Sequence, residues 1–175
     1  LTVSDGIPGC PSYTETFIIE EPDPITVSET IIDVTCNGGS DGSISIIASG
    51  GTAPLTYNWT GPGGPYSTAN INNLSAGSYT LTVSDGIPGC PSYTETFDIE
   101  EPNQITIDNS TITDVSCNGG SDGSINITAI GGTPTLTYNW TGPNGPYSGP
   151  NISGLTAGSY TLTISDGIPG CPPHI

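Results

Sequence analysis

Short runs of alternating apolar and polar residues, separated by clusters of glycine and proline, fill the sequence. In the run Ser43–Ser49, for example, Ile44, Ile46 and Ala48 fall on one face. A period of two is typical of a β-strand with one buried face, whereas glycine and proline mark turns. The other expected strands are Ile25–Ser28, Leu55–Trp59, one short strand between Tyr66 and Leu74, Ser78–Ser84 and Tyr93–Ile99.

The same blocks of sequence recur along the chain. LTVSDGIPGCPSYTETFIIEEP at Leu1 returns as LTVSDGIPGCPSYTETFDIEEP at Leu81, and its first half returns at Leu162. CNGGSDGSI begins at Cys36 and again at Cys117, so the period is about 80 residues. One copy has an extra residue between Ile107 and Cys117, and we expect this insertion in a linker or loop.

The triplets EEP at Glu20 and Glu100 interrupt the strand pattern, and we place the unit boundaries there. This divides the chain into the C-terminal strands of a preceding repeat (1–23), a complete repeat (24–103) and a repeat lacking its last strand (104–175). We expect a longer array of such repeats. Since no run has a helical period, the predicted fold is all-β, with tandem immunoglobulin-like β-sandwich modules arranged as a rod.

Five cysteines at recurring positions indicate an oxidising compartment and a disulfide framework, which a small module needs as a staple. Two connectivities respect the repeat. Cys36 could pair with Cys90 and Cys117 with Cys171 inside modules, with Cys10 pairing outside these residues. Alternatively, Cys10 could pair with Cys36 and Cys90 with Cys117 across boundaries. Counting strands favours the first set, because it brings Cys36 and Cys90 to the same end of a sandwich.

Aromatic residues recur within the strand runs. Trp59 and Trp140, each in LTYNWTGP, are in phase with apolar neighbours, which predicts core positions. The alternative is a sugar-stacking platform beside Tyr66 and Tyr147. The motif AGSY before Tyr79 and Tyr160 predicts a tyrosine corner, in which the phenol hydroxyl ties a strand to the preceding loop.

The chain has no Lys or Arg, 17 Asp and Glu, and a net charge of −17. Nucleic acids and anionic membranes are bound through basic side chains, so neither is an expected partner. No apolar run reaches the roughly 20 residues that a membrane-spanning helix needs. With one histidine and no basic residue, the usual catalytic triads lack their parts, and we expect no enzymatic activity.

Acidic residues in the glycine-rich loops are the only candidates for a cofactor. Asp41, Asp85, Asp122 and Asp166 each stand beside glycines and carbonyl groups, which suits Ca²⁺, although Asp-Gly is more often simply a turn. No other cofactor is expected. The glutamates of the two linkers, Glu20, Glu21, Glu100 and Glu101, are predicted to be solvated.

The order CNGGSDGSI, GGT, YNW, LSAGSYTLTVSD, GC and IEEP resembles the SprB-type repeat of large cell-surface adhesins in gliding bacteria. The resemblance implies type 9 secretion, an extracellular location on the bacterial cell surface, and a part in adhesion or gliding motility. We therefore expect a structural or adhesive segment of a long surface filament. Its expected partners are neighbouring repeats, further copies in a filament, and surface polysaccharide. The alternative is a carbohydrate- or calcium-binding extracellular module, and a matrix or sheath filament fits equally well.

Overall fold

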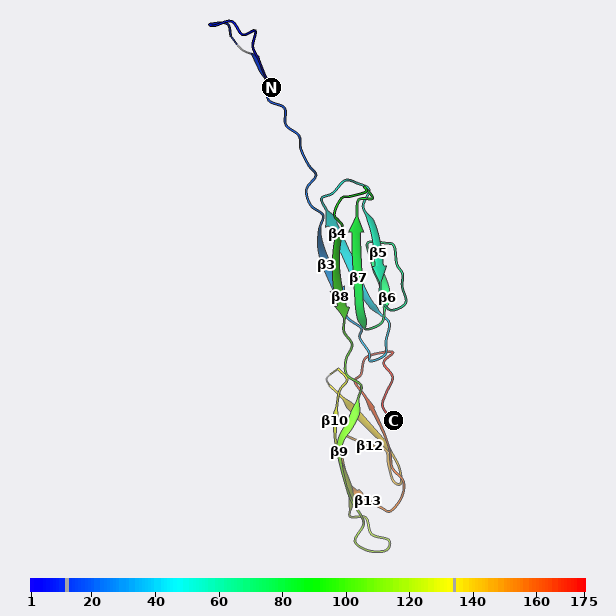
Figure 1. Cartoon of the computed structure of the whole chain (residues 1–175). Coiled ribbons are helices and arrows are strands. Elements are labelled where there is room, and N and C mark those ends of the chain that lie inside the picture. The colour runs from blue at the N-terminus through cyan, green and yellow to red at the C-terminus, as the bar shows by residue number, and fades with distance from the viewer. Residues whose placement is uncertain (12, 134) are drawn as a thin grey trace.

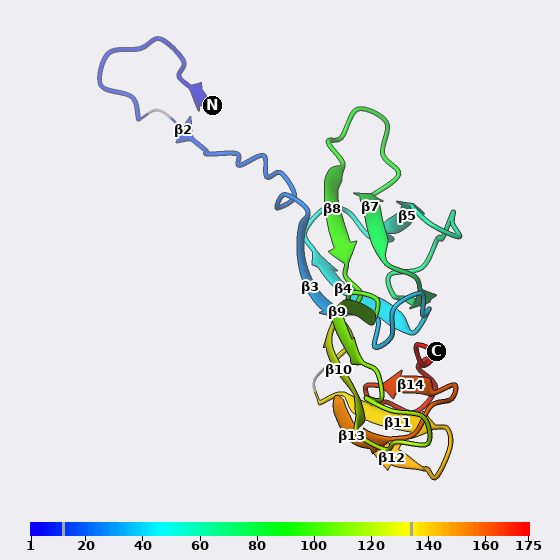
Figure 2. The ribbon, with the colours of Figure 1, turned by 90° about the horizontal axis from the view of Figure 1, so that it is seen from below.

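The computed structural model describes residues 1–11, 13–133 and 135–175, and within them it contains strands and no helix. Two β-sandwiches follow one another along the chain (Figure 1). We call β3–β8 the first sandwich and β9–β14 the second sandwich. An extended N-terminal segment (1–23) precedes them (Figures 1 and 2).

The first sandwich consists of two antiparallel sheets. One has the order β3-β4-β6 and the other β5-β7-β8. This is the division of strands found in immunoglobulin-type sandwiches. The strands are β3 (Thr26–Ile32), β4 (Gly42–Ser49), β5 (Thr56–Thr60), β6 (Ile71–Leu74), β7 (Gly77–Ser84) and β8 (Tyr93–Ile99).

The predicted alternation decides which side chains enter the first core. Tyr79, Leu81 and Val83 of β7 are fully buried, as are Ile44 and Trp59. Intervening polar residues of the same strands face outward, so the period-two prediction is confirmed for these strands. The first strand was predicted too short, because β3 continues beyond Ser28 to Ile32 and carries exposed isoleucines at its end.

The second sandwich repeats this arrangement, with sheets β13-β10-β9 and β12-β11-β14. Its core contains Ile127, Trp140, Leu155 and Ile164. The strands are β9 (Thr106–Thr113), β10 (Gly123–Ile130), β11 (Thr137–Thr141), β12 (Tyr147–Ser148), β13 (Asn151–Leu155) and β14 (Thr161–Ser165). Within the described residues, the free edge of β14 is bridged only by the pair Ile164–His174.

The extra residue of the second repeat was expected in a linker or loop. In the structure it lies inside a strand instead. Thr128 of β10 pairs with Asn109, but its neighbour Ala129 pairs with Ile107, so Asp108 forms a β-bulge in β9. A bulge adds one residue to one strand without changing the face of the residues beyond it. The division into 1–23, 24–103 and 104–175 stays a prediction.

Among its described residues, the N-terminal segment contains one short hairpin between β1 (Thr2–Val3) and β2 (Tyr13–Thr14). Its apolar residues are uncovered. Phe17 is 66% exposed and Ile19 is 98% exposed, although their counterparts Phe97 and Ile99 lie in the first core. The segment leaves the first sandwich at the end opposite the second sandwich (Figure 1).

Candidate functional site

The loop 33–41 between β3 and β4, which we call the CNGG loop, is organised around one carboxylate. Asp41 accepts hydrogen bonds from the hydroxyl of Thr35 at 2.5 Å and from its amide at 3.0 Å. Both bonds lower the pKa of Asp41, and the bond from the Thr35 hydroxyl has the larger effect. Gly38 has a φ of +73°, which glycine adopts without strain, and the turn closes where Gly39 donates to the Cys36 carbonyl at 2.9 Å.

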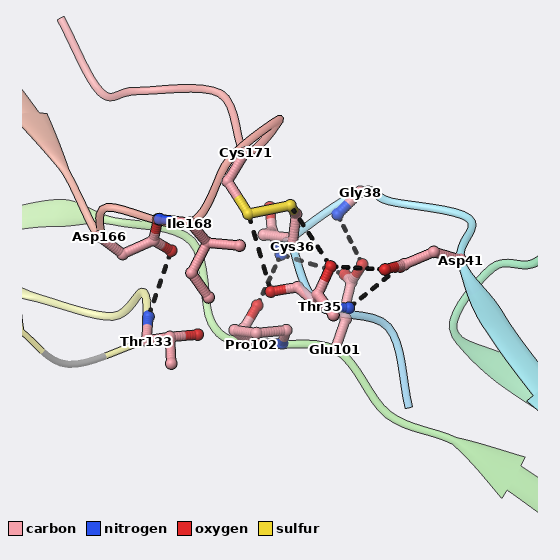
Figure 3. Close-up of a disulfide and its surroundings, with 11 residues drawn as sticks. Thr35, Cys36, Gly38, Asp41, Glu101, Pro102, Thr133, Asp166, Ile168 and Cys171 are labelled. Atoms are coloured by element: carbon pink, nitrogen blue, oxygen red, sulfur yellow. Dashed lines mark hydrogen bonds between the residues drawn. A yellow bond between two sulfur atoms is a disulfide. The ribbon is translucent and has the colours of Figure 1, made fainter. Parts of the chain in front are cut away.

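The linker after β8 fastens onto this loop. The Asn37 side chain donates to Glu101 Oε1 at 3.1 Å, and the Gly38 amide donates to Glu101 Oε2 at 2.6 Å (Figure 3). Beside it, the Val34 amide donates to the Glu100 carbonyl at 3.0 Å. Glu101 is exposed, as predicted for the linker, but its carboxylate also holds the loop and the linker together.

A disulfide joins the CNGG loop of the first sandwich to the second sandwich. Cys36 is bonded to Cys171, with the sulfur atoms 1.96 Å apart and the Cα atoms 5.2 Å apart (Figure 3). Cys171 lies in the loop after β14, where Asp166 accepts hydrogen bonds from the amides of Ile168 at 3.2 Å and Thr133 at 3.4 Å. The bond spans 135 residues of sequence.

Neither predicted connectivity matches this bond. The favoured set paired Cys36 with Cys90 and Cys117 with Cys171 inside modules, and the other set paired Cys10 with Cys36 and Cys90 with Cys117 across boundaries. In the structure Cys10, Cys90 and Cys117 are free and exposed. The pairing of Cys10 with a cysteine outside residues 1–175 stays a prediction.

The error came from counting strands. The stretch between Tyr66 and Leu74 was predicted to hold one strand, but the chain passes twice there. Tyr66 bridges back to Trp59, and β6 then runs along β4 in the other sheet. An additional pass reverses the end of the sandwich at which the following loop emerges.

Cys36 and Cys90 consequently lie at opposite ends of the first sandwich. Cys36 follows the Ile32 end of β3, whereas Cys90 lines a cavity with Pro24 and Ile25 at the start of that strand. Seven residues of β3 separate the two ends by about 23 Å, which is far too long for a disulfide.

The junction between the two sandwiches also contains a cavity that the Asn37 side chain helps to line. Asn37 of the first sandwich helps to line a cavity of about 190 Å³ whose other walls belong to the second sandwich and its linker, among them Ile105, Cys171 and His174. Asn37 also donates to the Pro102 carbonyl at 3.1 Å. The disulfide, the Glu101 contacts and this cavity all involve residues 36–38 of the CNGG loop.

The four candidate calcium residues serve as acceptors for backbone amides in their own loops. Asp85 accepts from Ile87 at 3.1 Å, and Asp166 accepts from Ile168 in the same way. Asp122 accepts from Ser116 at 2.9 Å, and the Ser116 hydroxyl and amide lower the pKa of Asp122. Over the described ranges no group of three or more His, Cys, Asp or Glu is placed to hold a metal ion. Calcium binding stays a prediction that no finding tests.

The aromatic predictions are confirmed. Trp59 is fully buried and its indole donates to the Thr68 carbonyl at 2.9 Å, and Trp140 is 4% exposed with its indole bonded to Gly149 at 2.9 Å. Neither indole face can serve as a sugar platform. Tyr79 donates to the Ser75 carbonyl at 2.9 Å and Tyr160 makes the equivalent bond, so both tyrosine corners are present.

Asn37, Gly38 and Glu101 were missed as contributors to the junction. The sequence does contain both partners, because CNGG at Cys36 is followed by EEP at Glu100. The sequence does not show that these two blocks are in contact, however, since Asn37 and Glu101 lie 64 residues apart and only the fold brings them together. Where the structure describes the chain, it has no helix that is long and apolar enough to cross a membrane.

The comparison with family models supports the resemblance. No curated protein matches the sequence. Among solved structures, one chain described as Sidekick-1 immunoglobulin domains 1-5 matches with 14% identity and a TM-score of 0.37, covering 83% of this chain and 37% of that one. The family model of the SprB repeat matches residues 28–64 and 109–145. The resemblance to the SprB-type repeat is therefore confirmed at these two stretches of the chain.

Proposed function

We propose that this chain is a structural and adhesive segment of a long, secreted bacterial surface filament, in which it acts as a stalk. The observation that carries the proposal is the bond between Cys36 and Cys171, because it fixes consecutive sandwiches to each other covalently. A stalk transmits force and extends reach, and both depend on the joint between units. The SprB repeat is a surface-adhesin family, and a disulfide suits an extracellular protein.

The contacts around the disulfide restrict bending of the joint. Domain interfaces without such contacts allow relative motion by default. Here Glu101 accepts hydrogen bonds from both Asn37 and the Gly38 amide, so the linker is held on the loop that carries Cys36. The proposed unit is therefore a stiff pair, and an array of such pairs would form a rod.

The charge of the chain fits exposure at a cell surface. A net charge of −17 without any Lys or Arg keeps such chains soluble and apart from one another at low salt. Export by type 9 secretion and a part in gliding motility follow from the family resemblance and belong to this proposal. The proposed role is mechanical and adhesive and requires no catalytic site.

Solution scattering on the oxidised chain tests the joint. We expect one narrow, elongated distribution of shapes, which broadens when the disulfide is reduced and broadens further when Glu101→Gln is added. Glu95→Gln is the matched control, because Glu95 pairs with Tyr93 on β8 and lies outside the joint. An oxidised chain that bends as freely as the reduced one would overturn the stalk proposal.

A further inference from the structure

We propose that Asn37 is a site of spontaneous chemical modification. Its side-chain amide is lost as ammonia, and the carboxylate that replaces it releases the linker from the CNGG loop. The reaction belongs to the dipeptide Asn37-Gly38, and Glu101 holds it back. The inference deepens the proposed function, and its consequence for a stalk rests on that function, since it names what loosens the joint.

Asparagine followed by glycine is the dipeptide most prone to losing its side-chain amide. The backbone nitrogen of the second residue attacks the side-chain carbonyl carbon of the first, and glycine has no side chain to hinder the approach. Gly38 is exposed, and a Cβ built on it would meet no atom within 4 Å apart from its two neighbours in the chain. Crowding therefore does not protect Asn37.

The reaction needs only water. The Gly38 nitrogen loses its proton and uses its electron pair to form a bond to Asn37 Cγ. The bond between Cγ and Nδ2 breaks, and Nδ2 takes up a proton and leaves as ammonia. Water then opens the five-membered imide at one of its two carbonyls, which gives either an aspartate or an isoaspartate at position 37.

In the structure one carboxylate holds both of the reacting groups. Glu101 Oε2 accepts a hydrogen bond from the Gly38 amide at 2.6 Å (Figure 3), and Glu101 Oε1 accepts one from the Asn37 side-chain amide at 3.1 Å. The same side-chain amide also donates to the Pro102 carbonyl at 3.1 Å. The linker thus fixes the attacking nitrogen and the leaving group together.

Glu101 slows the reaction for two physical reasons. Attack requires the Gly38 nitrogen to lose its proton, and the resulting anion would form beside a carboxylate, where a like charge disfavours it. The nitrogen must also give up its hydrogen bond to Glu101 before it can turn toward Asn37, and bonds to charged groups are among the stronger ones in proteins. The closed joint therefore protects Asn37.

Loss of the amide turns this contact into a repulsion. Asn37 is the donor toward both Glu101 and Pro102. A carboxylate at position 37 has no proton to donate at neutral pH, and it adds a negative charge that faces Glu101. No Lys or Arg in the chain can offset that charge. The isoaspartate product also lengthens the backbone by one carbon beside Cys36.

Protection and damage therefore depend on the same contact. While Glu101 is bonded to the CNGG loop, the reaction is slow. Once the contact opens, the amide is lost faster, and the product prevents the contact from forming again. The modification is irreversible in water, so each event leaves the joint open for good.

Peptide mass spectrometry of the full oxidised chain, incubated in mildly alkaline buffer, tests the protection. Glu101→Gln removes the charge and leaves one acceptor oxygen for two donors, so we expect Asn37 to lose its amide about tenfold faster than in the wild type. Glu100→Gln is the matched control. It removes the same charge one residue earlier, but the Glu100 carboxylate accepts no hydrogen bond among the described residues, so the rate should stay that of the wild type.

Asn144-Gly145 supplies an internal reference in the same samples. The Gly145 amide donates to the Gly142 carbonyl at 3.1 Å and the Asn144 side chain donates to the Thr156 hydroxyl at 3.4 Å, so no carboxylate takes part. Asn144 should lose its amide at one rate in all three forms. The rate at Asn37 is expressed relative to it.

Solution scattering of the reduced chain tests the consequence, because the disulfide then no longer holds the joint. We expect Asn37→Asp to broaden the distribution of shapes as Glu101→Gln does. Asn37→Asp combined with Glu101→Gln should narrow it again, since the glutamine amide can donate to the new carboxylate and the bond is restored in the reverse direction. Asn144→Asp adds the same charge away from the joint and should change nothing.

Three results would overturn the proposal. They are a rate at Asn37 that Glu101→Gln leaves unchanged, an equal acceleration by Glu100→Gln, and a combined variant as broad as Asn37→Asp alone. None of them touches the stalk, which is decided by freshly prepared oxidised wild type with Asn37 intact. A freely bending wild type would end the stalk proposal, while the rates at Asn37 would still report on the chemistry.

Discussion

At the scale of single residues, buried polar atoms decide how firmly each strand is tied to its loop. Tyr79 is fully buried, so its hydroxyl must find an acceptor inside the protein, and it finds the Ser75 carbonyl at 2.9 Å. The same bond recurs from Tyr160 to Thr156. These bonds fix the turn that precedes β7 in the first sandwich and β14 in the second sandwich.

Removing one of these hydroxyls should therefore lower stability. We expect Tyr79→Phe to reduce the free energy of unfolding of the first sandwich by about 1 to 2 kcal/mol, because the Ser75 carbonyl loses its donor. Chemical denaturation measures the change. Tyr57→Phe is the control, since the Tyr57 hydroxyl makes no hydrogen bond within the described chain. Equal losses in the two variants would contradict the role of the corner.

Asp41 gives the CNGG loop a dependence on pH. Its pKa is lowered by the Thr35 hydroxyl and amide, so the folded state binds the proton less readily than the unfolded chain does. The stabilisation is complete above the ordinary Asp pKa of about 4 and is lost as the pH falls through the lowered value.

The stability difference between the wild type and Asp41→Asn should accordingly shrink as the pH falls from 7 to about 2.5. Denaturation midpoints at several pH values measure it. Asp23→Asn is the control, because the Asp23 carboxylate accepts no hydrogen bond among the described residues. A difference that stays constant across this range would show that Asp41 acts without its charge.

At the scale of strands, the alternation of side chains fixes register more strictly than it fixes length. The second sandwich has one more residue in β9 than the first has in β3, and a bulge at Asp108 absorbs it. Beyond the bulge, Ile107 again pairs with Ala129, as Val27 pairs with Ala48. The same face of the strand therefore points toward the core in both sandwiches.

Deleting Asp108 should be tolerated for this reason. We expect a change of less than about 1 kcal/mol in the stability of the second sandwich, because the shortened β9 can pair as β3 does. Deleting Thr128 from β10 should unfold it, since a one-residue slip turns part of the buried set to solvent. Circular dichroism and hydrogen exchange measure both. Unfolding by the Asp108 deletion would show that the bulge is needed.

The strands could be predicted from the sequence because each carries its own alternation, and the tyrosine corner because AGSY is a local motif. The disulfide could not, because its pairing depends on which end of a sandwich each loop reaches. That end changed with one uncounted pass at Tyr66, a bridge of a single residue pair with no periodic signal. The contacts of Glu101 were missed for a related reason. The local sequence EEP is the same whether the Glu101 carboxylate is only solvated or also accepts hydrogen bonds from a distant loop.

At the scale of the whole molecule, the disulfide determines which parts of the chain carry tension. A pull on the two ends passes through residues 1–36, crosses from Cys36 to Cys171 and leaves through 171–175. The residues between the two cysteines lie outside this path, and only β3 of the first sandwich is loaded directly. Most of both cores is thus shielded while the bond is intact.

Stretched by its ends, the oxidised chain should therefore reach a total contour length of only about 40 residues, roughly 140 Å, which includes the already extended segment 1–23. A reductant should add the chain between Cys36 and Cys171, a sequence separation of 135, which is about 480 Å more. Cys36→Ser should show the longer extension without reductant, and Cys90→Ser should behave like the wild type, because Cys90 lies outside the bond. A full-length extension of the oxidised wild type would mean that tension bypasses Cys36–Cys171, and the joint would then offer a stalk no protection against unfolding.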